Sequence, residues 1–131
     1  MHKFDLKNRT AIITGGAQGF GLDIAKRFLN SGAKTIIWDI DESELIKVSK
    51  ELNSPNFSFN VVDISNYNKV KDTVSEIIKN SNIDILINNA GITGSTTSLW
   101  DYDVDEWNKI IQVNLMGTFN CCKCIVPNMI K

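Results

Sequence analysis

The chain has 131 residues, of which 43% are hydrophobic and 22% are charged, and its formal net charge is −1. These values are typical of one soluble globular domain. They exclude a strongly basic field for nucleic acid or for an anionic membrane surface. No apolar run approaches the roughly 20 residues that span a bilayer.

The cysteines and the N-terminus indicate where the protein works. The N-terminal residues contain no signal-peptide core. The cysteines are odd in number and close together, at Cys121, Cys122 and Cys124. This pattern favours a reducing compartment over a disulfide framework, and we expect the cytoplasm. Positions i, i+1 and i+3 of a helix do not converge on a tetrahedral metal, so we expect no metal site.

Strand-like and helix-like segments alternate along the whole chain. Short apolar runs predict four strands, at Thr10–Thr14, Thr35–Asp39, Ser58–Val62 and Asp84–Asn88. Amphipathic segments between them predict helices at Gly19–Ser31, Asp41–Leu52 and Asn66–Asn80. A last helix is predicted from Glu106 towards Ile130, with Asp105 as its cap and with interruptions at Gly117 and Pro127. We expect one domain over residues 1–131, incomplete at its C-terminus.

Apolar strands without alternation are typical of parallel strands covered on both faces. Repeated strand–helix units with right-handed crossovers predict a doubly wound parallel α/β sheet of Rossmann type, with strand order 3-2-1-4. The ligand crevice of such a sheet lies where the winding reverses, beyond the carboxyl ends of strands one and four. The glycine-rich stretch after the first strand and Asn88–Gly91 after the fourth therefore converge on one crevice.

The stretch Thr14–Gly21 reads Thr-Gly-Gly-Ala-Gln-Gly-Phe-Gly and joins the first strand to the first helix. Gly15 permits a tight turn, Gly19 lets the backbone approach a ligand closely, and Gly21 allows close packing of the helix. Phe20 supplies backbone and an apolar wall, and Gln18 adds no positive charge. The free N–H groups and the positive end of the helix dipole then face a pyrophosphate.

Two acids end the second and third strands. Asp39 lies 18 residues after Gly21, near the ~20 expected of an acid that binds the adenosine ribose. Its carboxylate repels a 2′-phosphate and so favours NAD over NADP, and we count Ile40 beside it as cofactor-binding. The alternative role for Asp39 is a cap for the second helix. Asp63, followed by Ile64, is positioned to accept from the adenine amino group, or to act as a turn acid.

These residues together resemble the short-chain dehydrogenase/reductase family. Thr14–Gly21 matches its Thr-Gly-x-x-x-Gly-x-Gly loop, Asn88-Asn89-Ala90-Gly91 matches its Asn-Asn-Ala-Gly motif, and Val113-Asn114-Leu115 resembles its helix-four asparagine site. The resemblance implies a nicotinamide-dependent oxidoreductase in which Asn89, Ala90 and Gly91 line the cofactor. It also implies that the backbone carbonyl of Asn114 holds a water in the proton relay.

One part of the family pattern is missing from this sequence. The family's catalytic serine, tyrosine and lysine lie beyond the next strand. Tyr67 and Lys71 have the spacing of the tyrosine–lysine pair, but they lie on the third predicted helix, in the wrong place along the chain. We therefore expect a C-terminally truncated fragment that cannot transfer hydride efficiently alone. A rate matching that of a full-length relative would contradict this expectation.

The resulting hypothesis is an NAD-dependent oxidoreductase that interconverts a secondary alcohol and a ketone when the parent chain is intact. We expect small-molecule substrates, no nucleic-acid or membrane partner, and a homo-oligomeric parent. Alternatives are a 3-oxoacyl-carrier-protein reductase, which usually prefers NADP, and a non-catalytic NAD-binding or interaction module. A methyltransferase with a similar sheet is a third alternative, which Asn88–Gly91 and the glycine spacing oppose.

Overall fold

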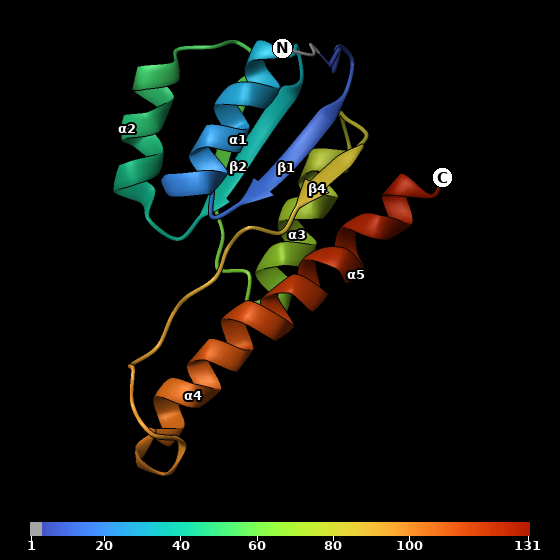
Figure 1. Ribbon diagram of the computed structural model, residues 1–131. Coiled ribbons are helices and arrows are strands. Elements are labelled where there is room, and N and C mark those ends of the chain that lie inside the picture. The colour runs from blue at the N-terminus through green and yellow to red at the C-terminus, as the bar shows by residue number, and fades with distance from the viewer. Residues whose placement is uncertain (1–3) are drawn as a thin grey trace.

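A computed structural model describes residues 4–131 of the chain (Figure 1). Its single parallel sheet has the strand order β3-β2-β1-β4, as the sequence predicts. The strands are β1 (Thr10–Thr14), β2 (Lys34–Asp39), β3 (Phe57–Val61) and β4 (Ile85–Ile87). In register, Ile12 of β1 lies between Ile36 of β2 and Leu86 of β4, so the crossover from β3 to β4 returns to the other side of β1.

Helices cover both faces of this sheet. They are α1 (Gly19–Asn30), α2 (Glu42–Leu52), α3 (Tyr67–Ile78), α4 (Val104–Ile111) and α5 (Gly117–Met129), with a 3-10 turn η1 (Leu99–Asp101) and a π-helical segment η2 (Gln112–Met116). The predicted bounds of the first three helices and of all four strands are correct to within two residues. Figure 1 shows α1 and α2 on one face and α3 and α5 on the other.

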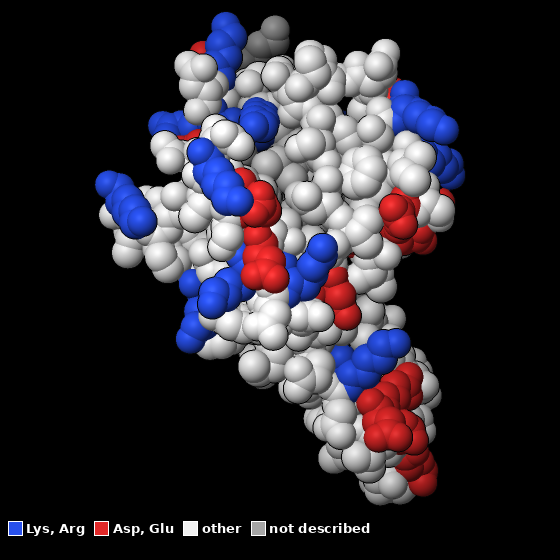
Figure 2. Space-filling model, turned by 180° about the vertical axis from the view of Figure 1, so that it is seen from behind, with Lys and Arg blue, Asp and Glu red and all other residues white. Residues whose placement is uncertain are grey.

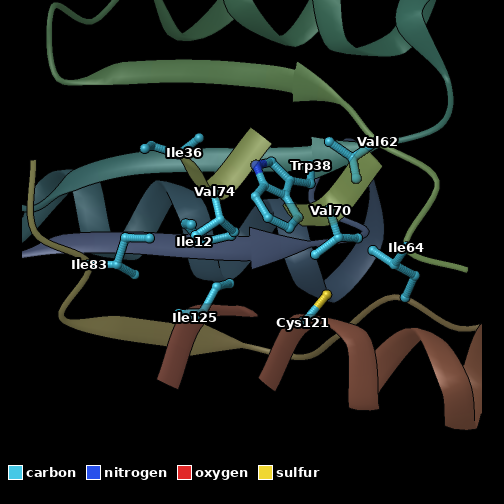
Figure 3. Close-up of a cluster of buried hydrophobic side chains, with 10 residues drawn as sticks. All are labelled: Ile12, Ile36, Trp38, Val62, Ile64, Val70, Val74, Ile83, Cys121 and Ile125. Carbon is cyan, nitrogen blue, oxygen red and sulfur yellow. The ribbon is translucent and has the colours of Figure 1, made fainter. Parts of the chain in front are cut away.

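Alternate residues of the strands fill the two layers between sheet and helices. Ile12, Ile36 and Trp38 point towards α3 and α5, whereas Ile13 and Ile37 point towards α1 and α2. Figure 3 shows the first group packed against Val70 and Val74 of α3 and against Cys121 and Ile125 of α5. Burial on both faces explains why these strands lack polar alternation in the sequence.

The last helix differs from the prediction in two respects. Its N-cap is Asp103, whose carboxylate accepts from the Glu106 N–H at 2.8 Å, so the assignment of the cap to Asp105 is wrong. Gly117 and Pro127 do not interrupt it either, because helical structure continues from Val104 to Met129 through η2. Pro127 lies in the last turn, where its missing N–H removes one intrahelical bond without ending the helix.

The N-terminal half of this helix extends beyond the body of the molecule. Figure 1 shows α4 below the sheet, joined to β4 by a long loop. Figure 2 shows acidic side chains gathered at the end of this projection. Within residues 4–131, no helix is both long and apolar enough to cross a membrane.

Candidate functional site

A cavity lies beyond the carboxyl ends of β1 and β4, at the predicted crevice. It has a volume of about 600 Å³. Ten of the twelve predicted cofactor-binding residues line it: Gly15, Gln18, Phe20, Asp39, Ile40, Asp63, Ile64, Asn89, Ala90 and Gly91. Gly19, Gly21 and Asn114 are not among the lining residues. The fold thus brings together residues as far apart in the sequence as Gly15 and Gly91.

The three glycines of the first loop that are predicted to bind the cofactor have different surroundings. Gly15 has a φ of +63°, and a Cβ there would lie 2.8 Å from the Ala90 Cα. A Cβ on Gly21 would overlap the carbonyl oxygen of Gly15, so only glycine fits where α1 meets the loop. Gly19 has a φ of +57° but open space on its Cβ side. Packing therefore requires Gly15 and Gly21, whereas backbone conformation alone favours glycine at position 19.

Asn89 connects the β4 end of the crevice to the glycine loop. Its side-chain amide donates to the carbonyls of Thr14 at 3.1 Å and Gly15 at 3.0 Å. The Thr14 hydroxyl accepts in return from the backbone N–H groups of Asn89 at 3.1 Å and Ala90 at 3.0 Å. These four bonds hold the two loops in a fixed relation, although the loops lie 74 to 76 positions apart in the sequence.

The N-terminus of α1 differs from the other helix starts. Side chains cap α2, α3 and α4, through Asp41, Asn66 and Asp103. The residue before α1, Gln18, forms no such side-chain bond, and the first turn of α1 contains no acid. The first N–H groups of a helix need acceptors from outside it. Beside the crevice, α1 therefore offers uncompensated donors and a positive dipole end, which suit an anion.

Asp39 lies at the opposite side of this loop. Its Oδ2 accepts from the Ala17 N–H at 3.2 Å, and its Oδ1 accepts from the Asp41 N–H at 3.1 Å. The cap of α2 is Asp41, which accepts from the Glu44 N–H at 3.1 Å. The capping role considered for Asp39 thus belongs to its neighbour. Hydrogen bonds from Ser43 and Glu44 hold the pKa of Asp41 below its ordinary value.

Asp63 occupies the turn after β3. Its Oδ1 accepts from the Ser65 N–H at 3.0 Å and from the Ser65 hydroxyl at 2.6 Å, so the turn role is present. Neither bond uses Oδ2. Ile64 is 5% exposed and belongs mainly to the core, and its carbonyl accepts from the buried Asn120 amide at 2.9 Å.

Asn114 lies in the middle of the π-helical segment η2. Its side chain donates to the Ile92 carbonyl and accepts from the Ile92 N–H, both at 2.8 Å. Its own carbonyl accepts from the Thr118 hydroxyl at 3.0 Å. The π turn loosens the helical ladder here, as π turns at functional sites often do.

Sequence reasoning missed one wall of the crevice. Lys109, Gln112 and Val113 line it from α4 and η2. They share one helical face because they are spaced i, i+3 and i+4, a pattern that the sequence contains. Among the described residues lining the crevice, Lys109 is the sole lysine or arginine. Trp38, Asp41, Val62, Ser65 and Ile92 complete the lining.

The loop from Ile92 to Tyr102 borders the crevice at one end and then folds onto α4. Ser95 binds Glu106 through its backbone N–H and its hydroxyl, both at 2.9 Å to Oε1. Tyr102 packs edge-on against Trp107 with ring centroids 5.6 Å apart. These contacts tie the loop to the projecting helix and leave Ile92 as its lining residue.

Comparison with known proteins gives relatives of one kind. The family described as short chain dehydrogenase matches residues 9–131. A 2-dehydro-3-deoxy-L-rhamnonate dehydrogenase (NAD(+)) of Sphingomonas sp. is 35% identical over 94% of this chain and 49% of its own length. The 3-oxoacyl-[acyl-carrier-protein] reductase FabG of Chlamydia pneumoniae is 38% identical over 96% of this chain and 52% of its own length.

Solved structures agree with this result. The gluconate 5-dehydrogenase from Burkholderia cenocepacia, in complex with NADP and tartrate, has a TM-score of 0.88 at 30% identity. The match covers 98% of this chain and 51% of that one. The chain thus spans about half the length of the curated relatives it matches. From the family match and the shared fold, the chain belongs to the short-chain dehydrogenase family.

Proposed function

We propose that the intact protein is an NAD-dependent oxidoreductase that interconverts a secondary alcohol and a ketone. The observation that carries this proposal is the uncapped N-terminus of α1 at a crevice whose other side holds Asp39. A dinucleotide needs an anion site for its diphosphate and an acceptor for its ribose hydroxyls on the two sides of one crevice. The proposal concerns the whole protein, because the described residues match only about half of each relative.

The residues present fit the adenosine diphosphate part of such a cofactor. The open space over Gly19 leaves room for a diphosphate at the N–H groups of the first turn of α1. The Asp39 carboxylate would accept from the ribose hydroxyls, and Asp63 Oδ2 from the adenine amino group. Ile40 and Phe20, which are 69% and 84% exposed, would supply apolar cover over the crevice mouth. When bound, the nicotinamide ring supplies hydride transfer at its C4.

The remaining site residues would shape the crevice around the cofactor and help to transfer protons. Asn89 holds the loop carbonyls back from the cofactor, and Ala90 and Gly91 continue the crevice floor. The Asn114 carbonyl in the π-helical segment would hold a water that passes a proton to and from the rest of the site. Proton transfer to the substrate oxygen would need an acid–base group outside these 131 residues, since the family's tyrosine–lysine pair has no counterpart on the crevice.

The proposed preference for NAD over NADP depends on the negative charge of Asp39. Asp39 would lie close to a 2′-phosphate and repel it, and the adjacent Gln18, Ile40 and Asp41 supply no cation to offset that repulsion. A relative named for NAD(+) and a solved neighbour in complex with NADP occur in the same family. The Asp39 position is therefore the feature that supports NAD over NADP in this proposal.

A second candidate is reduction of a 3-oxoacyl carrier protein, which the 38% identity to the Chlamydia reductase favours. One assay of the full-length protein distinguishes the two activities. We expect NADH formation with a panel of sugars, polyols and hydroxy acids, and little NADPH consumption with an acetoacetyl thioester. The reverse pattern would favour the reductase, and no turnover with intact NAD binding would favour a non-catalytic module.

We also propose that the intact protein is a homo-oligomer of the cytoplasm. Large apolar side chains remain exposed along α4, η2 and α5, at Trp107, Ile111, Leu115, Phe119, Val126 and Ile130. Most are spaced four apart and form one stripe on a continuous helix. Such a stripe is suited to pack against its own copy. The cysteines at 121, 122 and 124 are free thiols, which fits a reducing compartment.

A further inference from the structure

A second cavity of about 380 Å³ lies at the opposite end of the sheet from the crevice. It lies at the amino ends of β1 and β2, where the N-terminal segment passes the turn between α1 and β2. The residues that line it are Lys7, Asn8, Arg9, Thr10, Gly32, Lys34 and Asn56. We call this cavity the basic pocket. The dehydrogenase activity proposed above assigns it no role.

Positive charge is concentrated at the basic pocket. Lys7, Arg9 and Lys34 line it, and none of its described lining residues is acidic. The whole chain has a net charge of −1, so this is a local excess and not a property of the surface as a whole. Three cations around one concavity repel one another, and an anion between them relieves that repulsion.

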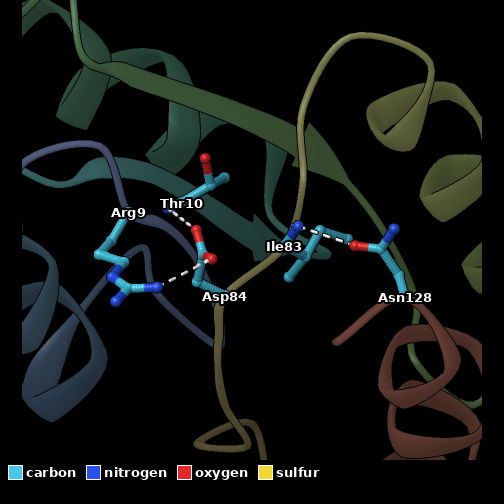
Figure 4. A network of polar contacts seen from close by, with 5 residues as sticks. All are labelled: Arg9, Thr10, Ile83, Asp84 and Asn128. Atoms are coloured by element: carbon cyan, nitrogen blue, oxygen red, sulfur yellow. Dashed lines mark hydrogen bonds and ion pairs between the residues drawn. The ribbon is translucent and has the colours of Figure 1, made fainter. Parts of the chain in front are cut away.

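Two of these cations are held in place by groups outside the pocket. The Arg9 guanidinium contacts Asp84 Oδ1 at 3.4 Å, while Asp84 Oδ2 accepts from the Thr10 N–H at 2.8 Å. Figure 4 shows this carboxylate between the two residues, just before β4. The Lys34 ammonium donates to the Ser81 hydroxyl at 2.8 Å. Asp84 offsets part of the Arg9 charge, but a guanidinium has five N–H donors and most remain for a ligand.

Several other polar groups at the basic pocket lack partners. In the described part of the chain, the Lys7 ammonium and the side-chain amides of Asn8 and Asn56 form no hydrogen bond. Gly32 packs closely against the N-terminal segment, because a Cβ there would lie 2.9 Å from the Lys7 Cγ. Asn8 has a left-handed backbone conformation, with a φ of +63°. The pocket therefore combines preformed walls with unused donors.

We propose that the basic pocket binds a small phosphate-bearing anion at a site separate from the crevice. A phosphate group presents several acceptor oxygens and up to two negative charges, which match the donors and the charge of Lys7, Arg9 and Lys34. A carboxylate monoanion carries half that charge and would bind more weakly. The volume admits a phosphate with a small organic group attached, so a phosphorylated metabolite is the chemical class indicated.

The test is calorimetric titration of the full-length protein with inorganic phosphate and with pyrophosphate, at low ionic strength and with NAD present in excess to fill the crevice. The informative variant is Lys7→Gln/Lys34→Gln, which removes two pocket charges without touching Asp84. The matched control is Lys47→Gln/Lys79→Gln, which removes two charges from lysines that are 72% and 62% exposed elsewhere. Binding of NAD itself is measured on the same samples.

We expect saturable pyrophosphate binding that weakens at least about tenfold in the pocket variant and by less than about twofold in the control. NAD affinity should be the same in all three proteins. No saturable binding by the wild type would overturn the proposal, and so would an equal loss in both variants, because that would show a general charge effect. Either failure leaves the crevice and its function unaffected.

Discussion

The Asn89 side chain, which follows β4, donates to the Gly15 carbonyl in the loop after β1 at 3.0 Å. The same amide also reaches the Thr14 carbonyl at 3.1 Å. One side chain thus sets the distance between the two loops of the crevice. A carboxamide suits this position because its NH₂ group has two donors, one for each carbonyl.

Asn89→Ala should therefore lower the free energy of unfolding by about 1–3 kcal/mol, because two half-buried carbonyls lose their donor. The neighbouring Asn88→Ala is the control, since among residues 4–131 the Asn88 side chain forms a hydrogen bond only to the Cys122 sulfur, at 3.4 Å. We expect it to change stability by less than about 0.5 kcal/mol. Urea unfolding of both variants measures the difference. Equal stability of the two would show that the Asn89 bonds contribute nothing.

Substitutions of Gly21 and Gly19 should affect folding stability and NAD affinity differently. Gly21→Ala should cost about 1–3 kcal/mol, because its methyl group would overlap the Gly15 carbonyl. Gly19→Ala should cost about 1 kcal/mol through its positive φ alone, but its methyl group would project into open space at the proposed diphosphate position. We expect Gly19→Ala to lose NAD affinity while remaining folded. Thermal unfolding and NAD titration of the pair check this, and unchanged NAD affinity in Gly19→Ala would place the diphosphate elsewhere.

Asp39→Ser should shift cofactor preference towards NADP. Loss of the carboxylate removes the acceptor for the ribose hydroxyls and the repulsion of a 2′-phosphate, so the NADP-to-NAD affinity ratio should rise by about tenfold or more. Asp41→Asn is the control, because it removes the same charge two residues away and asparagine also caps helices well. A similar change of ratio in both variants would mean that general charge, and not Asp39, sets the preference.

Leu115→Asp should break the proposed homo-oligomer. Leu115 is 61% exposed in the middle of the apolar stripe, and a buried, unpaired carboxylate at an interface is strongly unfavourable. Ile46→Asp on α2 is the control, because Ile46 is 42% exposed and lies outside the stripe. Light scattering after size-exclusion chromatography gives the mass of each. An unchanged mass for Leu115→Asp would exclude this stripe as the interface.

Cys121 should make stability fall at high pH. Burial raises the pKa of its thiol from 9.0 to about 12. Above pH 9 the unfolded chain loses this proton while the folded protein keeps it, so the unfolded state is favoured by up to about 1.4 kcal/mol per pH unit until about pH 12. Urea unfolding of wild type and Cys121→Ala at pH 8 and pH 10 measures the effect. The wild type should lose more stability than the variant between these values, and parallel losses would contradict the assignment.

Much of the fold was predictable from local pattern. The buried runs around Ile12 and Ile36 indicated parallel strands, and the order of strands followed from the handedness of crossovers. The crevice was predictable for the same reason, since Gly15 and Asn89 end adjacent strands. Asp103 was predictable too, because Asp103 and Glu106 have the spacing of a capping box, a signal that the assignment to Asp105 passed over.

Other features depend on contacts that no local pattern contains. The π turn at Asn114 accompanies a pair of hydrogen bonds to Ile92, which is 22 positions away. The place of Lys109 and Gln112 on the crevice depends on how α4 projects past the sheet. Both features depend on tertiary packing, which the periodicity of the sequence does not reveal.

The central claim is that the crevice binds NAD with its diphosphate over α1 and its ribose on Asp39. Calorimetric titration of the folded wild-type protein with NAD, and in parallel with S-adenosylmethionine, tests it most directly. We expect one saturable NAD site per chain, with heat that vanishes in an Asp39→Ser/Gly19→Ala double variant, and no uptake of S-adenosylmethionine. A folded protein that takes up no NAD, or that prefers S-adenosylmethionine, would contradict the claim.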